Sequence, residues 1–264
     1  MHKIAVIGGT GVYDPRMLEE VHEESLVTPF GKITYKMGQY RGQEVIFIPR
    51  HGAGHTIPPH LINYRANIWG LKKLGVNTIL ATTAVGSLNL AMKPGDFVLV
   101  DQFLDFTKNR QHTFYEGGER GVVHVDVTDP YCAALRAVLA RAAVESSLSV
   151  HRSGVYVCTE GPRFETPAEI RAFTMLGGDL VGMTNVPEVV LAREAEMCYA
   201  TISMVTNFAA GISPTPLTHA EVLETMEANT DNLKQLVMKA IDLMDTKQSC
   251  LCGSALKEFG GFKL

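Results

Sequence analysis

The sequence has little of what would place a protein at a membrane or on a nucleic acid. None of its apolar runs approaches the roughly 20 residues that a bilayer-spanning helix needs. Acidic residues outnumber basic ones by 28 to 24, whereas nucleic-acid surfaces are usually basic. The first apolar run is interrupted at Gly8, too early for a cleavable signal segment. We therefore expect a cytoplasmic protein that binds neither membranes nor nucleic acids.

Cysteine is also scarce, with five residues in a chain of 264. An odd number in a chain of this length does not indicate a disulfide framework, which agrees with a cytoplasmic location. Cys132, Cys158 and Cys198 lie in apolar segments, and we interpret them as inert core residues. Cys250 and Cys252 form a C-x-C pair, which we expect to be reduced in a C-terminal tail, residues 247–264, that is loose from Gly253 onwards. Redox activity of this pair is the alternative.

Two common nucleotide-binding patterns are missing from the start of the chain. The turn Gly8-Gly9-Thr10-Gly11 lacks the third glycine of G-x-G-x-x-G, and no P-loop Gly-Lys-Ser/Thr follows it. The acidic residues at 19–24 fall in a helix-like or loop segment, which argues against an NAD-dependent oxidoreductase. Backbone N–H groups of such a turn can still surround a phosphate. A purely structural turn explains the stretch equally well.

The alternation of short β-like runs with helical stretches predicts an α/β fold with one main domain, residues 1–246. Strands are predicted at 3–7, 44–49, 78–84, 96–100, 154–159 and 200–207, and helices at 60–74, 130–146, 187–199 and 219–244. The strand at 78–84 is apolar on both faces, as expected at the centre of a sheet. Thr218 and Glu221 form a predicted capping box before the last helix. The polar segment 102–125 is expected to be a long loop.

Arg50 and His51 directly follow a predicted strand. The planar guanidinium of Arg50 suits bidentate contact with phosphate, and His51 can donate a further hydrogen bond to an oxyanion. A surface ion pair between Arg50 and a carboxylate is the plainer alternative. His51, His55 and His60 do not match a zinc-ligand spacing, and no Cys, Asp or Glu lies near them, so we predict no metal here.

Further polar and aromatic residues stand at predicted strand ends, where ligands of α/β proteins gather. Thr83 ends the central strand. Phe164 can stack on a flat ring, and Glu165 can accept an N–H from that ring. Thr184 and Asn207 end two later strands, and an Asn amide can both donate to and accept from a heterocycle. Each stretch taken alone is also explained by a turn or a capped helix start.

Taken together and in this order, these stretches resemble the nucleoside phosphorylase family, in particular its branch of purine nucleoside and methylthioadenosine phosphorylases. The resemblance runs from the first glycine turn to about Leu243. Its most specific motifs are Arg50-His51-Gly52, Asn63-Tyr64-Arg65-Ala66-Asn67, Thr159-Glu160-Gly161-Pro162-Arg163-Phe164-Glu165 and Gly182-Met183-Thr184-Asn185-Val186-Pro187-Glu188. The resemblance implies a single α/β domain whose central mixed, partly barrel-like sheet is flanked by helices. It also implies a homotrimer, sometimes doubled to a hexamer.

The resemblance implies a reaction as well. Inorganic phosphate is a co-substrate, with no cofactor, and it attacks the anomeric carbon of a ribosyl ring while a purine leaves through an oxocarbenium-like transition state. The implied phosphate contacts are Thr10, Arg50, His51, Thr83, Ala84 and Thr184. The implied nucleoside contacts are Phe164, Glu165, Met183, Asn207, Ala209 and His219. His51 and Asn207 are the implied catalytic residues, with Asn207 hydrogen-bonded near N7 of the leaving purine.

Three positions favour 6-oxopurine nucleosides, inosine and guanosine, as substrates. Methylthioadenosine phosphorylases carry aspartates near the positions of Asn207 and Ala209, and this chain does not. Glu165 can accept from N1–H of hypoxanthine or guanine, whereas N1 of adenine presents a lone pair. His219 can bond a 5′-hydroxyl where methylthio-specific members have an apolar residue. S-methyl-5′-thioinosine and S-methyl-5′-thioadenosine are the alternative substrates.

His124 aligns with a residue that family members lend to the sugar site of a neighbouring subunit. We therefore expect a homo-oligomer, a trimer or a hexamer, that acts in purine salvage. A surface histidine with no such role is the alternative. A non-catalytic purine-binding module is the remaining rival interpretation, and such a module would not need phosphate.

Overall fold

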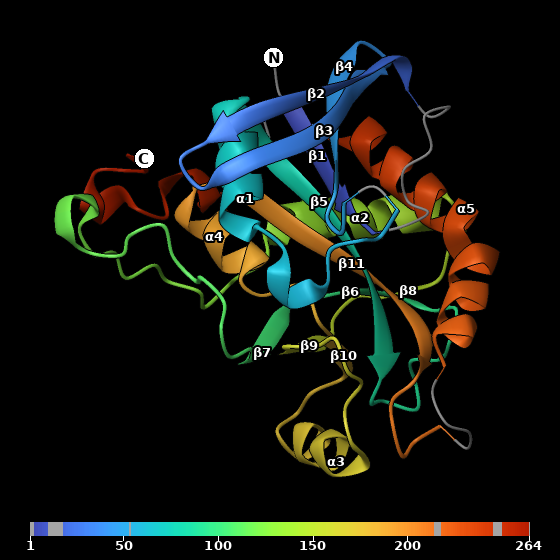
Figure 1. Cartoon of the computed structure of the whole chain (residues 1–264). Helices are drawn as coiled ribbons and strands as arrows, with labels where there is room; N and C mark the ends of the chain where they lie inside the picture. Colours follow the sequence, from blue (N-terminus) through green and yellow to red (C-terminus); the bar gives the residue numbers. More distant parts are fainter. Residues whose placement is uncertain (1–2, 10–17, 53, 214–217, 245–249, 264) are drawn as a thin grey trace.

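The computed structural model describes residues 3–9, 18–52, 54–213, 218–244 and 250–263. Within them, eleven strands form one mixed sheet flanked by helices, which confirms the predicted fold (Figure 1). The strands are β1 Lys3–Gly8, β2 Glu19–Thr28, β3 Gly31–Tyr40, β4 Gln43–Pro49, β5 Val76–Ser87, β6 Phe97–Leu99, β7 Gln102–Phe106, β8 Val150–His151, β9 Val155–Thr159, β10 Leu180–Gly182 and β11 Cys198–Phe208. The helices are α1 Tyr64–Lys73, α2 Ala133–Glu145, α3 Pro167–Met175, α4 Glu188–Glu194 and α5 His219–Leu243, with short 3-10 helices η2 Pro59–Leu61, η3 Gly118–Arg120, η4 Cys252–Ser254 and η5 Lys257–Phe259.

β5 and β11 form the centre of the sheet. β11 runs parallel to β5, from Cys198 beside Thr78 to Phe208 beside Ser87. β5 also pairs with β1 in parallel and with β10 in antiparallel orientation. The register between β5 and β11 shifts after Val205, so β11 carries one extra residue in a β-bulge. The carboxyl ends of the two central strands therefore meet at one edge of the sheet, just beyond the bulge.

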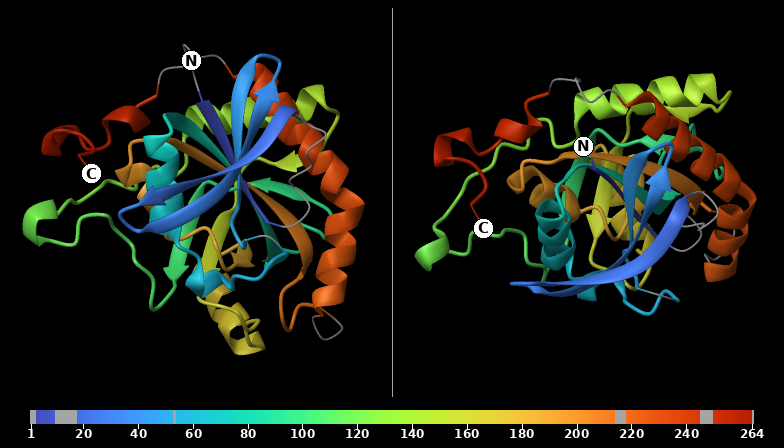
Figure 2. Two further views of the ribbon diagram at one scale, coloured as in Figure 1. Left: turned by 45° about the horizontal axis from the view of Figure 1, so that its top comes forward. Right: turned by 90° about the horizontal axis from the view of Figure 1, so that it is seen from above.

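β2 and β3 form an antiparallel hairpin at the outer edge of the sheet (Figures 1 and 2). We predicted a helix-like segment or loop for residues 19–24, and this prediction was wrong. Most side chains of β2 are exposed on both faces, so its sequence shows no alternation of apolar and polar residues. The strand is held extended by its backbone pairing with β3 and by Tyr35, whose hydroxyl donates to Glu24 Oε2 (2.7 Å).

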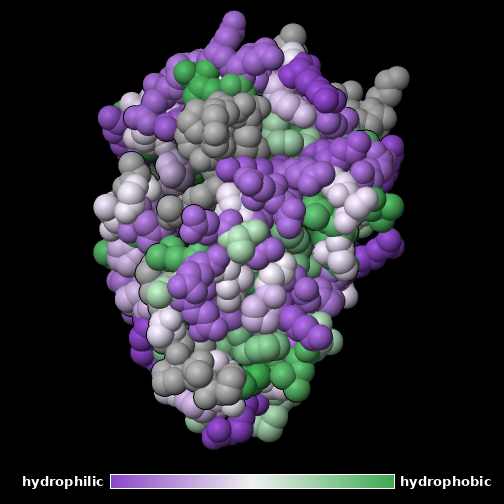
Figure 3. Space-filling model, turned by 90° about the vertical axis from the view of Figure 1, so that its right-hand side faces the viewer, coloured by the Kyte–Doolittle hydropathy of each residue, from purple (hydrophilic) through white to green (hydrophobic). Residues whose placement is uncertain are grey.

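Helices cover the sheet on different sides (Figure 2). α1 and α4 pack against each other and share one core cluster with β1, β4 and β5. α2 and α5 pack together over a second cluster, which includes side chains of β6 and β11. The face of the molecule that carries α5 is mainly hydrophilic, with its largest hydrophobic area near the lower end (Figure 3). Among the residues that the structure describes, no helix is long and apolar enough to cross a bilayer.

The predicted strands and helices are all present, with shifts at their ends. Two predicted boundaries were wrong. The helical pattern at 187–199 covers α4 only as far as Glu194, and the chain then turns and enters β11 at Cys198. The segment 102–125 is not a continuous loop, because its first five residues form β7 alongside β9. β7 is largely exposed, so its pairing left no apolar pattern in the sequence.

The C-terminal segment, residues 250–263, packs onto the domain. Leu256 is fully buried, and the carboxylate of Glu196 accepts hydrogen bonds from the backbone N–H groups of Leu256 (3.0 Å) and Phe262 (3.1 Å). The ring of Phe262 lies edge-on to Phe114, at 5.5 Å between centroids. The predicted loose tail was therefore wrong for this segment, whose few anchoring residues are too widely spaced to form a periodic pattern.

Candidate active site

One cavity of about 560 Å³ opens where β5 and β11 end, a size typical of small-molecule sites. Ten of the residues predicted from the sequence line it: Arg50, His51, Thr83, Ala84, Phe164, Glu165, Met183, Thr184, Asn207 and Ala209. Thr10 and the side chain of His219 lie outside the described residues. His124 is exposed on the segment before α2 and does not line the cavity. The structure therefore brings most of the predicted set together in one cavity.

Arg50 lies in the wall of the cavity and is paired with Glu188, the first residue of α4. Arg50 Nε donates to Glu188 Oε2 (2.8 Å), and Nη2 donates to Oε1 (2.7 Å). Tyr199 on β11 donates its hydroxyl to the same Oε1 (2.7 Å). The two charged side chains are 1% and 0% exposed. Removing one partner of such a buried pair leaves an uncompensated charge, so each partner holds the other in place.

This pairing corrects the predicted use of Arg50. The guanidinium edge that we expected to face phosphate faces Glu188, and Nη1 donates to the carbonyl oxygen of Thr82 (3.0 Å). Nη2 also lies 3.5 Å from the Ile7 carbonyl oxygen. Of the five N–H groups of an arginine, one on Nη1 is left without a partner among the described residues. Arg50 can thus give an anion one charge-assisted hydrogen bond rather than a bidentate contact.

His51 lies beside Arg50 in the cavity. Its Nδ1 is 2.8 Å from the carbonyl oxygen of Ile57, which can only accept, so Nδ1 carries the proton. Burial lowers the pKa of His51 to about 4, despite that hydrogen bond, and the charges of Arg50 and His55 add to the effect. At neutral pH the ring is therefore neutral and Nε2 is an acceptor. The prediction that His51 donates to an oxyanion is wrong for this tautomer, because Nε2 can only accept, for example from a hydroxyl of phosphate.

The end of β5 supplies hydroxyl groups. Between Thr78 and Ser87 the strand is buried except at Ala84, which is exposed in the cavity wall. Thr83 Oγ1 lies 2.8 Å from Ser203 Oγ on β11. Thr82 Oγ1 is buried and has no hydrogen-bond partner among the described residues. A buried hydroxyl without a partner costs free energy, so Thr82 is a candidate ligand donor that the sequence analysis left out of the phosphate contacts.

Phe164 and Glu165 lie in the turn between β9 and α3. Thr166 and Glu169 close a reciprocal capping box at the start of α3, and this fixes the turn. Thr159 Oγ1 donates to Glu165 Oε1 (2.7 Å). Burial raises the pKa of Glu165, and the Thr159 hydrogen bond offsets part of the rise. Phe164 remains 42% exposed, so the cavity has an aromatic face that a ligand can cover.

The β-bulge positions Asn207. Thr206 Oγ1 donates to Asn207 Oδ1 (2.8 Å), and Asn207 Nδ2 donates to the carbonyl oxygen of Phe208 (2.9 Å). Gly86 faces this amide from β5, and a Cβ there would come within 3.3 Å of Nδ2. The amide orientation is therefore fixed, with one N–H and one oxygen lone pair left for a ligand.

Arg110 holds together the two loops that carry most of these residues. Its Nη1 donates to the carbonyl oxygen of Val186 (2.6 Å), and its Nη2 donates to those of Thr159 (3.0 Å) and Glu160 (2.8 Å). In the sequence Arg110 falls in the polar segment 102–125, where nothing marks it for this role. No local pattern could have shown it, because the partners are backbone carbonyls 49 to 76 residues further along the chain.

The remaining wall of the cavity is apolar. Val222, Leu223 and Met226 of α5 line it, together with Met183. Gly161 has φ of +66°, and a Cβ there would come within 2.5 Å of the Met183 sulfur, so the close approach of this loop to Met183 requires glycine. In the sequence these α5 residues recur at helical spacing, which predicts the helix but not its place in a cavity wall.

The cavity therefore offers three kinds of contact. Hydroxyls, one guanidinium N–H and an imidazole acceptor suit a partly protonated oxyanion. A carboxylate, an amide and an aromatic ring suit a flat heterocycle with hydrogen-bonding edges. The apolar wall suits the less polar part of a ligand. Such an arrangement fits two reactants held side by side.

Comparison with protein families gives a match along nearly the whole chain. The model of the phosphorylase superfamily matches residues 3–242. The chain is 57% identical to a probable 6-oxopurine nucleoside phosphorylase of Dictyoglomus turgidum, and 97% of each chain is covered. It is 53% identical to the 6-oxopurine nucleoside phosphorylase of Pyrococcus furiosus, covering 97% of this chain and 98% of that one. It is 52% identical to a probable S-methyl-5′-thioinosine phosphorylase of Methanothermobacter thermautotrophicus, covering 96% and 89%.

Solved structures give a concordant result. The fold is similar to that of methylthioadenosine phosphorylase from Schistosoma mansoni in complex with adenine, with a TM-score of 0.92 and 36% identity over 98% of this chain and 97% of that one. A methylthioadenosine phosphorylase from an antarctic soil metagenomic library has a TM-score of 0.91 at 37% identity, covering 97% and 91%.

Proposed function

This chain belongs to the phosphorylase superfamily, and we propose that it is a 6-oxopurine nucleoside phosphorylase. The enzyme uses inorganic phosphate to cleave inosine and guanosine, and it releases the free base and ribose 1-phosphate. The names of its relatives at 53–59% identity support this substrate class.

The observation that carries the proposal is a buried carboxylate, Glu165, in the same cavity as the fixed amide of Asn207. A 6-oxopurine presents N1–H, which a carboxylate accepts, and a 6-oxo group, which an amide N–H donates to. Adenine presents a lone pair at N1 and an amino group at C6, so both partners would face mismatched groups. Sites built for a particular hydrogen-bonding pattern reject the mismatched analogue by about 10⁴-fold.

The chemistry needs one bond to form as another breaks. A phosphate oxygen bonds to the anomeric carbon while the bond from that carbon to N9 of the purine breaks, and the electron pair goes to the purine. Positive charge develops on the sugar, and the adjacent phosphate stabilises it. Negative charge develops on the purine, and the one free N–H of Asn207, shared between the 6-oxo group and the adjacent N7, stabilises it. Both contacts strengthen in the transition state, which is what accelerates the reaction.

The phosphate end of the cavity favours a monohydrogen phosphate. His51 Nε2 accepts the hydrogen bond of the phosphate hydroxyl, because Nδ1 already carries the imidazole proton. Arg50 Nη1 and the hydroxyls of Thr82 and Thr83 donate to the ionised oxygens. The buried Glu188 holds Arg50 in the orientation that this contact requires.

The second candidate substrate is S-methyl-5′-thioinosine, which keeps the 6-oxo base. The apolar wall of Val222, Leu223 and Met226 favours a thioether over a free hydroxyl. A relative at 52% identity is named for this substrate. We retain inosine and guanosine as the first candidates because four relatives of higher identity are named for 6-oxopurine nucleosides.

We further propose a homotrimer or hexamer that acts in purine salvage in the cytoplasm. His124 supports the oligomer, because it is exposed and lies outside the cavity lining of its own chain. Sedimentation of the purified protein measures its assembly state. If His124 completes a neighbour's sugar site, His124→Ala raises KM for inosine while the assembly state is unchanged.

The test of the proposed function is base release from inosine, guanosine, adenosine, S-methyl-5′-thioinosine and S-methyl-5′-thioadenosine, each with and without phosphate. We expect phosphate-dependent release, fastest from inosine and guanosine. Faster turnover of methylthioinosine than of inosine would move the assignment to the second candidate. Preferred turnover of adenosine or methylthioadenosine would contradict the roles given to Glu165 and Asn207. Release without phosphate, or no release at all, would overturn the proposed phosphorolysis.

A further inference from the structure

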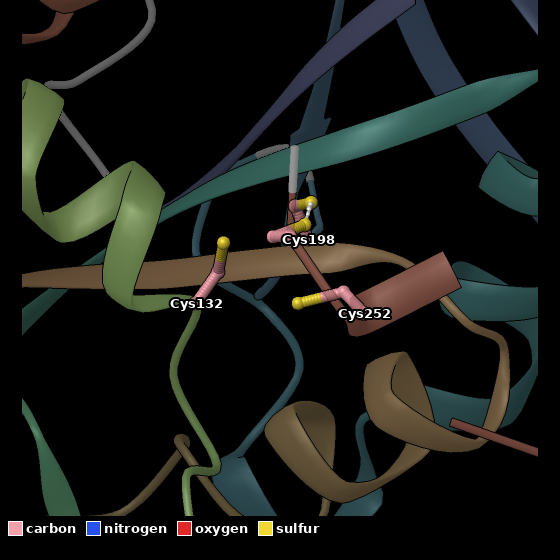
Figure 4. Close-up of side chains that lie close together, drawn as sticks. Cys132, Cys198 and Cys252 are labelled. Atoms are coloured by element: carbon pink, nitrogen blue, oxygen red, sulfur yellow. Dashed lines mark hydrogen bonds between the residues drawn. The ribbon is translucent and has the colours of Figure 1, made fainter. Parts of the chain in front are cut away.

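Four of the five cysteines form a cluster far from the cavity. The sulfur atoms of Cys132, Cys198, Cys250 and Cys252 all lie within 4.8 Å of one another. Cys198 and Cys250 share a hydrogen bond, with 3.2 Å between their sulfur atoms. The side chains of Cys132, Cys198 and Cys252 converge on one point (Figure 4). The fifth cysteine, Cys158, is buried elsewhere and bonds to the backbone of Val186.

The four cysteines come from three parts of the chain. Cys132 is the N-cap residue of α2, and Cys198 is the first residue of β11. Cys250 and Cys252 belong to the C-terminal segment. The backbone N–H of Cys132 donates to the carbonyl oxygen of Tyr199 (2.9 Å), so the start of α2 and the start of β11 are joined independently of the thiols.

The C-terminal segment is also positioned without help from its thiols. Glu196, two residues before Cys198, accepts the backbone N–H groups of Leu256 and Phe262. Leu256 is fully buried. The convergence of the four sulfur atoms is therefore a consequence of the fold on both sides of the cluster, which makes it a built site.

Simple packing does not explain this arrangement. One thiol in an apolar environment behaves as a small hydrophobic group, but four adjacent thiols form only weak hydrogen bonds with one another. The distance between the sulfur atoms of Cys198 and Cys250 is well beyond the 2.03–2.05 Å of a disulfide, so these two are separate thiols. Four thiolates at the corners of a small volume are the usual ligand set of a structural zinc ion.

We propose that Cys132, Cys198, Cys250 and Cys252 bind one zinc ion in a tetrahedral tetrathiolate site. A Zn–S distance of about 2.3 Å places the four sulfur atoms about 3.8 Å apart. The sulfur atoms of Cys198 and Cys250 lie 3.2 Å apart, and no two sulfur atoms of the cluster lie more than 4.8 Å apart. These distances lie on both sides of the required spacing, so side-chain rotations suffice to reach it. Four sulfurs around one point suit zinc, whereas calcium and magnesium require oxygen ligands. Cys250 is exposed and gives the ion a path of entry.

The site is structural rather than catalytic. Four protein ligands leave no open position on a tetrahedral ion. Asn207 lies nine positions after Cys198 along β11, which places the cluster about 30 Å from the base-binding end of the cavity. Zinc would attach the C-terminal segment to the starts of α2 and β11, and the N-terminus of α2 would help to stabilise the thiolate of Cys132.

The first test measures metal directly on the full chain, purified under a non-thiol reductant and without a histidine tag. We expect about one zinc per chain by elemental analysis. Replacement by Co²⁺ should give thiolate-to-cobalt charge-transfer bands and the strong visible bands of a tetrahedral cobalt ion. Reduced protein that shows five titratable thiols and binds neither metal would overturn the proposal. So would an isolated protein lighter by four hydrogens, which would show two disulfides, and so would iron in place of zinc.

Matched variants assign the ligands. Cys250→Ser is the mildest of the four substitutions because the residue is exposed, and Cys252→Ser removes a buried ligand. Each should weaken retention of zinc against a chelator by at least tenfold. Cys158→Ser is the control, because it also removes one thiol but leaves the cluster intact. Equal zinc retention in Cys250→Ser and Cys158→Ser, with the cobalt spectrum unchanged, would contradict the proposed ligand set.

Discussion

The two ends of β11 carry chemically different clusters on one strand. At its carboxyl end, Thr206 and Asn207 lie in the cavity, and their polar groups are partly satisfied by the protein. At its amino end, Cys198 joins three other cysteines whose sulfur atoms face one another. At the cavity end, some hydrogen-bond donors and acceptors remain free for a ligand. At the cysteine end, the four sulfur atoms face one point.

The carboxyl end of β11 is therefore suited to binding a ligand, and the amino end is suited to stabilising the fold. In the cavity, each polar side chain is oriented by a neighbour and still keeps a free group, as Asn207 does between Thr206 and Phe208. A ligand there competes with water and can leave. At the cysteine end, the groups that converge come from segments far apart in the chain, so what binds there holds the fold together. Substitutions at the two ends should therefore change different observables.

The largest effect is expected from breaking the buried pair below the cavity. Glu188→Ala leaves the Arg50 guanidinium without its counter-charge in a site that is 1% exposed. We expect the free energy of unfolding to fall by about 3–5 kcal/mol and turnover to be lost. Denaturant unfolding at fixed protein concentration measures the change. Glu145→Ala removes two surface ion pairs, one with Arg141 on α2 and one with Lys239 on α5, and should change the free energy of unfolding far less, because surface ion pairs contribute little. Similar stability of the two variants would contradict the role given to Glu188.

The next effect concerns Glu165 and pH. Glu165→Gln removes a charged acceptor, worth about 1.5–3 kcal/mol, so kcat/KM for guanosine should fall by about 10- to 100-fold. Burial raises the pKa of Glu165 above that of an ordinary glutamate. The protonated carboxyl no longer accepts N1–H, so the wild-type enzyme should lose activity on acidification. This loss should begin at a higher pH than the titration of an ordinary glutamate would give.

Two variants sharpen this pH prediction. Glu165→Gln should abolish the acid-side loss of activity. Glu169→Gln should keep it, because the Glu169 carboxylate caps α3 and its pKa is lowered to about 2 by the Arg163 hydrogen bond. An acid limb that persists in Glu165→Gln would assign it to another group. His51 is not a candidate for that limb above pH 5, since its pKa lies near 4.

A smaller effect is expected from changing the base preference. In the wild type, Asn207 Nδ2 lies 2.9 Å from the Phe208 carbonyl oxygen, so Asn207→Asp places a carboxyl oxygen against that carbonyl. The new carboxyl should therefore stay protonated. The amide N–H that was free to bind the base is lost with the substitution. We expect inosine turnover to fall about tenfold and adenosine turnover to rise, measured as the ratio of the two kcat/KM values. Thr206→Val is the control, because it removes the hydroxyl that bonds Asn207 Oδ1 and the Val85 carbonyl oxygen but no group assigned to the base, so it should slow both substrates without changing their ratio. An unchanged ratio in Asn207→Asp would refute the base contact.

The smallest effect on activity is expected at the cysteine end. Cys252→Ser should leave kcat/KM for inosine within about twofold of the wild type, while Tm falls by several degrees, because it loosens the C-terminal segment and leaves the cavity intact. Thermal melts and initial rates on the same samples check both. Loss of activity at an unchanged Tm would show that the two ends of β11 are coupled.

The sequence predicted the elements and the residues of the site better than it predicted their contacts. Polar residues at the ends of strands are visible locally, which is why Thr83, Glu165 and Asn207 could be named. The partner of Arg50 could not be, because Glu188 lies 138 residues further along the chain. The donor role of His51 was misassigned for a different reason: its tautomer depends on the Ile57 carbonyl, six residues further along, and on how the intervening loop folds back. The β2 strand of the β2–β3 hairpin was missed because its side chains are mostly exposed and show no apolar alternation.

The sequence by itself determined the α/β class, the central buried strand and the motifs that mark a nucleoside phosphorylase, since these depend on local periodicity and on residues close together in the chain. Only the tertiary structure decided which donors remain free in the cavity and which charges neutralise each other. It alone brought Cys132, Cys198, Cys250 and Cys252 to one point. Hydrogen bonds, ion pairs and metal ligands act over a few ångströms in space, and the distance between two residues along the chain does not determine that separation.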